Sequence, residues 1–256
     1  YINDDDLVLV VNGDTPLISP YTIKSFVSFL EMGNYDAALV SAVFDKTPAY
    51  GRIIRDCAGN LSKIVEQKDC NEEELKIEEV NIGLYCFKGK LLKESFSKLD
   101  NNNAQKEYYI TDIPYHIIHD GGKVGVYMIQ DPDETQGINS RSDLSIVTKT
   151  LLEQTRKLHM DNGVTLIDPS NTYISLDAKI GKDTIIYPGT NIQGKTIIGQ
   201  NCVIGPNSNI ISSTIGDNTI VELSKIDSST IASNVKIGPF ANIRPNSNIS
   251  SNTKVG

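Results

Sequence analysis

The spacing of hydrophobic residues changes once along the chain, shortly after residue 161. Before this point, short aliphatic runs typical of strands alternate with longer segments that carry helix start and stop signals. From Ile174 onward the spacing becomes six, which fits neither a helix nor an ordinary hairpin. The pattern therefore predicts two regions of different architecture.

The first region, residues 1–161, is expected to mix strands and helices. Leu7–Val11 is an unbroken aliphatic run, which suits a strand covered on both faces, as in a parallel sheet. Ser19 and Pro20 form a helix start, and Gly33 is expected to cap that helix. Further strands are expected at 37–44, 52–55, 61–66, 79–87 and 123–129, and further helices at 90–99, from a Thr111 cap to Gly121, and at 141–161. Strands alternating with helices imply an α/β layered domain.

The second region repeats every six residues, as a parallel β-helix does. The isoleucines expected to stack inside its coils are Ile174, Ile180, Ile186, Ile192, Ile198, Ile204 and Ile210. The small residues expected at its tight corners are Ala178, Thr184, Thr190, Thr196, Cys202, Ser208 and Thr214. The register slips around 215–226 and resumes at Ile231.

Composition and charge narrow the class of protein. The chain has 256 residues, enough for one large or two ordinary domains, and its net charge of −8 argues against nucleic acid as a partner. No apolar run approaches the ~20 residues of a membrane span, and we expect no signal peptide. The four cysteines are spread apart, so we expect free thiols and a cytoplasmic protein without a membrane partner. Because the chain begins at Tyr1 and ends within a repeat, we expect a piece of a longer protein.

Asp14 is the first residue that suggests chemistry. It follows the aliphatic run and Asn12-Gly13, at the carboxyl end of a predicted strand, where open α/β sheets bind ligands. Asp is also a common turn residue, so a simple turn role remains open.

Several motifs together carry a resemblance. They are NGDTPLI, YGRIIRD, IVEQKD, EEVNIGLYCF, LDNNNAQKEYYITD and QGINSRSDL, and hexapeptide repeats follow them. In this order they resemble the GlmU family, bifunctional bacterial enzymes of UDP-N-acetylglucosamine biosynthesis for the cell wall and its peptidoglycan. The run NNNAQKEYYITD is the most specific of them.

The resemblance implies an architecture and two transferase reactions. It implies a Rossmann-like uridyltransferase domain (1–140), a linker helix (141–163) and a left-handed parallel β-helix (164–256) that assembles as a homotrimer. The first domain would transfer UMP from UTP to N-acetylglucosamine 1-phosphate, and the second would move acetyl from acetyl-CoA to glucosamine 1-phosphate. The family's Gly-rich phosphate loop and most of its acetyltransferase residues have no counterpart in these 256 residues. We therefore expect both domains to be partial and this chain alone to catalyse neither reaction.

The resemblance also assigns residues. Asp14 and Asn139 match the family's Mg²⁺ ligands, and a carboxylate, an amide oxygen and substrate phosphates suit that ion. Without the resemblance, Asn139 would be taken as the N-cap of the helix that starts at Arg141.

The UDP-sugar positions of the family are matched by Asn12, Gly13, Gly51, Glu66 and Asn81, together with Asp14 and Asn139. The alternatives for these residues are a turn glycine, a charge at a hairpin edge and an amide at a strand end. Arg244 matches an arginine near the glucosamine phosphate, and its alternative is an exposed arginine on the β-helix. No Ser-His-Asp or Cys-His arrangement is expected, because metal-assisted phosphoryl transfer relies on positioning and charge neutralisation.

Two other functions remain open at this point. One is a different sugar-1-phosphate nucleotidyltransferase with a β-helix tail. The other is a non-catalytic trimeric scaffold.

Overall fold

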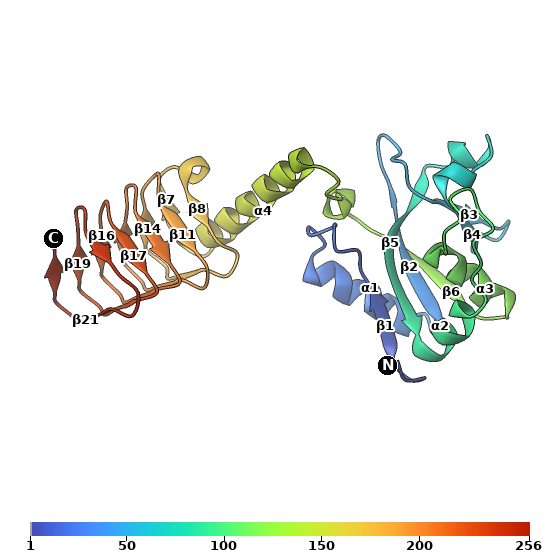
Figure 1. Cartoon of the computed structure of the whole chain (residues 1–256), viewed down its shortest axis with the longest axis horizontal. Coiled ribbons are helices and arrows are strands. Elements are labelled where there is room, and N and C mark those ends of the chain that lie inside the picture. The colour runs from blue at the N-terminus through green and yellow to red at the C-terminus, as the bar shows by residue number, and fades with distance from the viewer. Residues whose placement is uncertain (1) are drawn as a thin grey trace. The chain divides into compact units, whose positions relative to one another are not determined.

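The computed structural model describes residues 2–256 and separates into two compact units, one reaching Asp143 and the other running from Leu144 to Gly256 (Figure 1). The first is a mixed α/β unit and the second is a parallel β-solenoid. No helix among the described residues is both long enough and apolar enough to cross a membrane.

The sheet of the first unit is built around its longest strand, β5. Its strands are β1 (Leu7–Val10), β2 (Ala37–Val43), β3 (Arg52–Arg55), β4 (Leu61–Val65), β5 (Glu79–Lys88) and β6 (Val124–Met128). They are ordered β4-β3-β5-β2-β6, and β1 pairs with β5 beside β3. The β2–β6 pair is parallel, whereas β1, β2 and β3 all run antiparallel to β5.

The expectation for β1 was wrong in one respect. The run does form a strand, but it pairs antiparallel to β5, with Leu7 and Leu9 exposed and Val8 and Val10 half-buried. Among the described residues β1 has β5 as its sole strand partner. An unbroken aliphatic run fixes neither strand direction nor the number of covered faces, so it could not reveal this arrangement.

Helices cover both faces of the sheet. The helices of this unit are α1 (Pro20–Met32), α2 (Gly89–Phe96) and α3 (Ile113–His119), with 3-10 turns at Gln67–Asp69, Glu74–Lys76, Ile110–Asp112 and Pro132–Thr135. On the α1 face, Phe26 and Leu30 pack with Val40 and Leu84. On the other face, α2 and α3 bury Leu92 and Ile113 against residues that include Leu39 and Phe87. These three layers fix the strand ends that carry the candidate site.

The starts of α1 and α3 test the N-cap residues expected from the sequence. Ser19 caps α1 as expected, since its side chain accepts the N–H of Thr22. Thr111 does not cap α3: it lies in a 3-10 turn, and the N-cap position of α3 belongs to Asp112. The Pro at the start of α3 makes a side-chain cap less necessary, because Pro lacks one of the N–H groups a cap would satisfy.

The second unit contains most of helix α4 (Arg141–Asp161) and three parallel sheets of short strands (Figure 1). The first sheet contains β7 (Thr165–Leu166), β10 (Ile185–Ile186), β13 (Val203–Ile204), β16 (Ile220–Val221), β19 (Lys236–Ile237) and β22 (Lys254–Val255). The second contains β8 (Tyr173–Ile174), β11 (Asn191–Gln193), β14 (Asn209–Ile211), β17 (Lys225–Asp227) and β20 (Asn242–Ile243). The third contains β9 (Lys179–Ile180), β12 (Ile197–Ile198), β15 (Thr214–Ile215), β18 (Thr230–Ile231) and β21 (Asn248–Ile249).

The aliphatic residues form one continuous core through the coils, as the spacing predicted. The slip in the sequence does not interrupt it, because Ile198 pairs with Ile215 and Ile210 with Ile226. The turns there are a residue shorter, so each coil uses fewer residues while its strands stay stacked.

The shorter turn corrects one corner residue. Thr214 was expected at a buried corner, but it is exposed, and Ser213 occupies the buried position.

Turn positions of the solenoid adopt the left-handed conformation, which Asn tolerates better than most residues. Its asparagines with positive φ are Asn201, Asn207, Asn218, Asn234, Asn246 and Asn252.

Candidate active site

The loop after β1 brings Asp14 beside the segment that leads into α4. The Ile138 N–H donates to the Asp14 carbonyl oxygen over 2.8 Å. The turn itself is closed by Thr15, whose hydroxyl donates to the Asn12 carbonyl over 3.1 Å. The exposed Asp14 carboxylate forms no hydrogen bond or ion pair with any residue that the structure describes, so a turn role does not account for it.

A second contact holds this junction together from the α1 side. Glu134, in the 3-10 turn Pro132–Thr135, accepts the Ser19 N–H at 2.9 Å and the Thr22 hydroxyl at 2.6 Å. The start of α1 and the segment before Asn139 are thereby fixed to each other. These contacts explain why Asp14 and Asn139, 125 positions apart in the sequence, lie in neighbouring loops.

Asn139 is free of the capping role that local sequence suggested. The side chain of Ser140 accepts the Asp143 N–H at 3.1 Å, and the Asp143 carboxylate accepts the Asn139 backbone N–H at 3.1 Å. This reciprocal pattern caps α4 without the Asn139 amide. The exposed Asn139 side chain is therefore available for another partner.

A pocket of about 260 Å³ opens next to this loop. It brings together four of the residues predicted from sequence: Asn12, Gly51, Glu66 and Asn81. They come from the loop after β1, the position just before β3, the position just after β4 and the first residues of β5. Gly13 is exposed at the β1 loop and does not line the pocket.

Asn81 is held rigidly in the pocket wall. Its Nδ2 donates to the Tyr85 hydroxyl at 2.6 Å, and its backbone N–H donates to the Gly51 carbonyl at 2.8 Å. Gly83 has a φ of +79°, and a Cβ there would lie 2.3 Å from Asn12 Nδ2. A residue with a side chain at 83 would thus displace Asn12.

Glu66 is half-buried beside Gly51. Burial raises the pKa of its carboxyl, the nearby Asp69 and Asp112 raise it further, and a hydrogen bond from Thr111 opposes the shift. A Cβ at position 51 would come within 3.3 Å of Glu66 Oε1, so Gly51 leaves room at the carboxylate. Such a carboxylate can accept hydrogen bonds from hydroxyl groups of a ligand.

Sequence reasoning missed several residues of this site. Tyr85 and Gly83 line the pocket, and Thr111 lines it while bonding Glu66. Tyr50 lines it too, and burial together with the charge of Asp14 raises the pKa of its hydroxyl. The Gly83 in Asn81-Ile82-Gly83 interrupts a strand pattern, and such an interruption often marks a close approach of backbone to another group.

The side chains of this site supply few ligands for a metal ion. Among the described residues, no group of three or more His, Cys, Asp and Glu side chains could hold a metal ion. One uncommitted carboxylate and one uncommitted amide oxygen remain, from Asp14 and Asn139. That donor set fits Mg²⁺, which retains several waters and commonly takes the rest of its ligands from phosphates.

Arg244 lies in the second unit, after β20, and its side chain is exposed. Its carbonyl oxygen accepts from the hydroxyls of Ser229 and Ser247, each at 2.7 Å. The backbone is therefore anchored while the guanidinium faces solvent.

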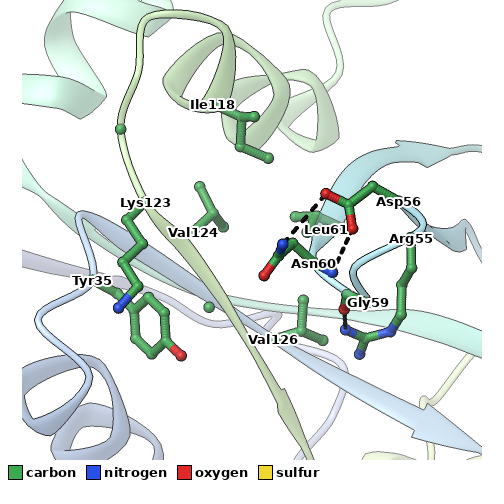
Figure 2. A pocket seen from close by; sticks show the side chains of 12 residues that line it. Tyr35, Arg55, Asp56, Gly59, Asn60, Leu61, Ile118, Lys123, Val124 and Val126 are labelled. Atoms are coloured by element: carbon green, nitrogen blue, oxygen red, sulfur yellow. Dashed lines mark hydrogen bonds between the residues drawn. The ribbon is translucent and has the colours of Figure 1, made fainter.

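A larger pocket of about 450 Å³ lies away from every predicted site residue (Figure 2). It is bounded by Tyr35 and Lys123 on one side and by the β3–β4 turn with Asp56 and Asn60 on the other. Its charged groups already have partners: Asp56 accepts from Asn60, and Lys123 donates to the Gly33 carbonyl at 2.9 Å. We assign it no ligand.

Comparison with known proteins matches a segment of the chain to a family and nearly the whole chain to longer relatives. Residues 177–212 match the bacterial transferase hexapeptide (six repeats) family. The chain is 48% identical over 254 residues to "Bifunctional protein GlmU" of Clostridium kluyveri. The aligned residues cover 99% of this chain and 56% of that protein. It is 46% identical over 256 residues to the protein of that name from Clostridioides difficile, covering 100% of this chain and 56% of the relative. The chain thus spans about half the length of the curated relatives it matches.

Proposed function

We propose that this chain, which is GlmU-like throughout and spans about half of such a protein, carries the sugar-phosphate side of an N-acetylglucosamine-1-phosphate uridyltransferase. The observation that supports this most directly is the pocket in which Asn12, Gly51, Glu66 and Asn81 converge, beside the free carboxylate of Asp14. In this proposal residues 1–140 belong to the uridyltransferase domain, 141–163 to a linker helix and 164–256 to an acetyltransferase domain.

The pocket residues are suited to hold an acetamido sugar. Glu66 would accept hydrogen bonds from sugar hydroxyls, and Gly51 would let the backbone approach the acetamido group. Asn12 and Asn81 each offer both a donor and an acceptor. Because Asn81 is fixed by Tyr85, its amide would not need to reorganise when the sugar binds.

Asp14 and Asn139 would hold Mg²⁺ at the edge of this pocket, and the ion would neutralise phosphate charge when bound. The attacking sugar phosphate is already an anion, so no strong general base is required. The chain's own contribution is to position the sugar and keep its phosphate next to the two ligands.

We further propose an acetyltransferase role for the solenoid and a homotrimeric assembly. The exposed Arg244 would bind the phosphate of glucosamine 1-phosphate, for which a guanidinium gives bidentate geometry. Apolar side chains exposed on the coils, such as Leu176 and Phe240, would be covered in the trimer. UTP and acetyl-CoA would be the donor substrates of the whole protein.

A chimera tests the uridyltransferase proposal. The aligned segment of the Clostridium kluyveri relative is replaced by this chain, and pyrophosphate release and free CoA are measured separately. We expect Asp14→Asn and Asn139→Ala each to lower uridyl transfer by about 10²–10³-fold, as loss of one preorganised electrostatic contact does. Acetyl transfer should remain near the level of the unmodified chimera.

Two controls separate this role from folding and from the alternatives. Asp5→Asn, an exposed carboxylate near the same strand, should leave both activities unchanged. Equal loss of both activities in Asp14→Asn would show misfolding rather than a lost ligand. A folded chimera that binds no UDP-N-acetylglucosamine and releases no pyrophosphate would favour a scaffold, and a preference for another sugar phosphate would favour a different nucleotidyltransferase.

A further inference from the structure

A pocket of about 280 Å³ lies within the second unit, between α4 and the first coils of the solenoid. Leu152 and Arg156 form its α4 side, and Asn171, Tyr173 and Asn191 lie on the solenoid side. Its volume is close to the lower end of small-molecule sites, about 300 Å³. None of the residues assigned to either transferase site lines it.

The unusual feature of this pocket is its arginine. Arg156 is only 9% exposed, yet no ion pair involves it among the residues that the structure describes. Its one hydrogen bond runs from Nη1 to the Thr172 carbonyl, at 3.2 Å. A guanidinium has five N–H donors, so most of them have no protein acceptor.

The free donors of Arg156 are not sealed inside the protein. The fully buried side-chain atoms that lack a hydrogen-bond partner include Arg52 Nε but no atom of Arg156. Since Arg156 is largely buried and lines the pocket, its unpaired N–H groups have access to the pocket space. A buried charge is costly without a counter-charge, so this arrangement favours an anion from outside.

The rest of the lining supports the same conclusion. Arg156 is the one charged residue in it, and no carboxylate lines the pocket, although the whole chain has a net charge of −8. Ser170 and Asn191 also line the pocket, and their side chains carry a hydroxyl and an amide N–H from which an oxyanion can accept hydrogen bonds. The lining therefore offers donors to an anion and no carboxylate to repel it.

We propose that this pocket is a binding site for a small oxyanion, a phosphate or carboxylate group held by Arg156. The guanidinium presents parallel N–H groups that match two oxygens of such an anion. The site is independent of both transferase sites, and it does not depend on the function proposed above.

Thermal unfolding of the 256-residue chain in increasing sodium phosphate tests the proposal, with sodium chloride of equal ionic strength as reference. We expect phosphate to raise the melting temperature in a saturable way, because it binds the folded state. Sodium gluconate in a parallel titration distinguishes a carboxylate preference from a phosphate preference.

Arg156→Met keeps an unbranched apolar stem but removes the charge, so phosphate binding should weaken by about tenfold or more. The matched control is Lys149→Met, on the same helix, whose side chain is 76% exposed and which does not line the pocket. Its response to phosphate should equal that of the unmodified chain. Without phosphate, Arg156→Met should melt no lower than the unmodified chain, since an unpaired buried charge is lost.

Asn191→Asp covers the case in which Arg156→Met does not fold. It places a carboxylate in the same lining, so the response to phosphate should fall there too. The proposal is overturned if neither anion stabilises the unmodified chain beyond the chloride reference. It is also overturned if a folded Arg156→Met, or failing that Asn191→Asp, responds to phosphate like the unmodified chain.

Discussion

The two units of this protein differ in how far apart in sequence their contacting residues lie. In the solenoid, each strand pairs with strands one coil away, as Ile186 pairs with Leu166 and Ile204. In the α/β unit, β1 pairs with β5, and the loop after β1 contacts the segment at Ile138. Periodic sequence therefore specifies the solenoid locally, whereas the candidate site depends on contacts that no short segment encodes.

The difference should appear in how the units respond to substitution. Solenoid stability is close to a sum over coils and their neighbours. The site in the α/β unit joins several elements, so one change there can alter both stability and binding. The experiments below compare matched residues within and between the units.

The largest effect is expected from a core residue of the solenoid. Ile198 is 2% exposed and its neighbour Ile197 is 45% exposed, on the same short strand. Ile198→Ala should lower the free energy of unfolding of the second unit by about 2–5 kcal/mol. Ile197→Ala should change it by no more than about 0.5 kcal/mol. Urea unfolding combined with hydrogen exchange measures both, and similar losses for the two variants would contradict the inward stacking.

The next effect compares two glycines of the α/β unit that share a left-handed conformation. A Cβ at Gly59 (φ +84°) meets nothing within 4 Å, so Gly59→Ala should cost about 1–2 kcal/mol for conformation alone. A Cβ at Gly83 (φ +79°) would meet Asn12, so Gly83→Ala should cost about 1 kcal/mol more.

The two glycine variants should also differ in binding. Titration calorimetry with UDP-N-acetylglucosamine, in the chimera described above, should show weaker binding for Gly83→Ala and none of this loss for Gly59→Ala. Unchanged affinity in Gly83→Ala would separate Asn12 from the sugar site.

A smaller effect concerns the hydroxyls at the solenoid corners. Thr196 Oγ1 donates to the Gln193 carbonyl at 2.6 Å and accepts the Ser213 N–H at 3.4 Å. Thr196→Val should therefore destabilise the second unit by about 1–3 kcal/mol, because the Ser213 N–H loses its acceptor. Thr190 Oγ1 is buried without a partner, so Thr190→Val should be neutral or stabilising. Equal melting temperatures for the two variants would show that the corner hydrogen bonds contribute little.

The smallest effect is a contrast in pH dependence inside the α/β unit. Burial would raise the pKa of Glu79, but hydrogen bonds from Arg55 (2.8 Å) and Ser41 (2.6 Å) lower it below the usual 4.5. Its contribution to stability is therefore present above that value and is lost as the pH falls through its lowered pKa. Burial raises the pKa of Glu66, so its contribution is largest at low pH and is lost as the pH rises from 4.5 through the raised value.

Glutamine variants test the sign of each shift. At pH 7, Glu79→Gln should be less stable than the unmodified chain, and Glu66→Gln should be more stable. Both differences should shrink on acidification toward pH 4, and a difference of the same sign in both variants would refute the assignment.

Local signals in the sequence predicted the helices and strands well where a single physical cause decided the outcome. The Ser19 cap, the β3–β4 hairpin and the six-residue spacing each determine their own segment. They failed where a second segment decided: the direction of β1 depends on β5, and the true corner at Ser213 depends on how the coil closes.

The candidate site was predicted through family motifs, and most of its geometry could not be. The capping of α4 is an exception, because Ser140 and Asp143 form the Ser-x-x-Asp pattern of a capping box, which was overlooked when Asn139 was taken as the N-cap. Gly83 indicates that some group approaches the strand closely, but nothing near Asn81 identifies that group as Asn12 or shows that Tyr85 would hold the Asn81 amide. The contact of Asn12 with Gly83 appears only when the end of β1 meets β5, because these spatial neighbours are distant along the chain.

The shortened turns between Ile210 and Ile231 have a consequence for how such a chain can change over time. Because strand pairing continues from Ile210 to Ile226 across them, losing a residue at a corner leaves the inward residues inward. Losing one within a two-residue strand would exchange an inward isoleucine for an outward polar neighbour in the coil. Deletions should thus accumulate at corners and be purged from strands, so that related solenoids keep their number of coils better than their number of residues.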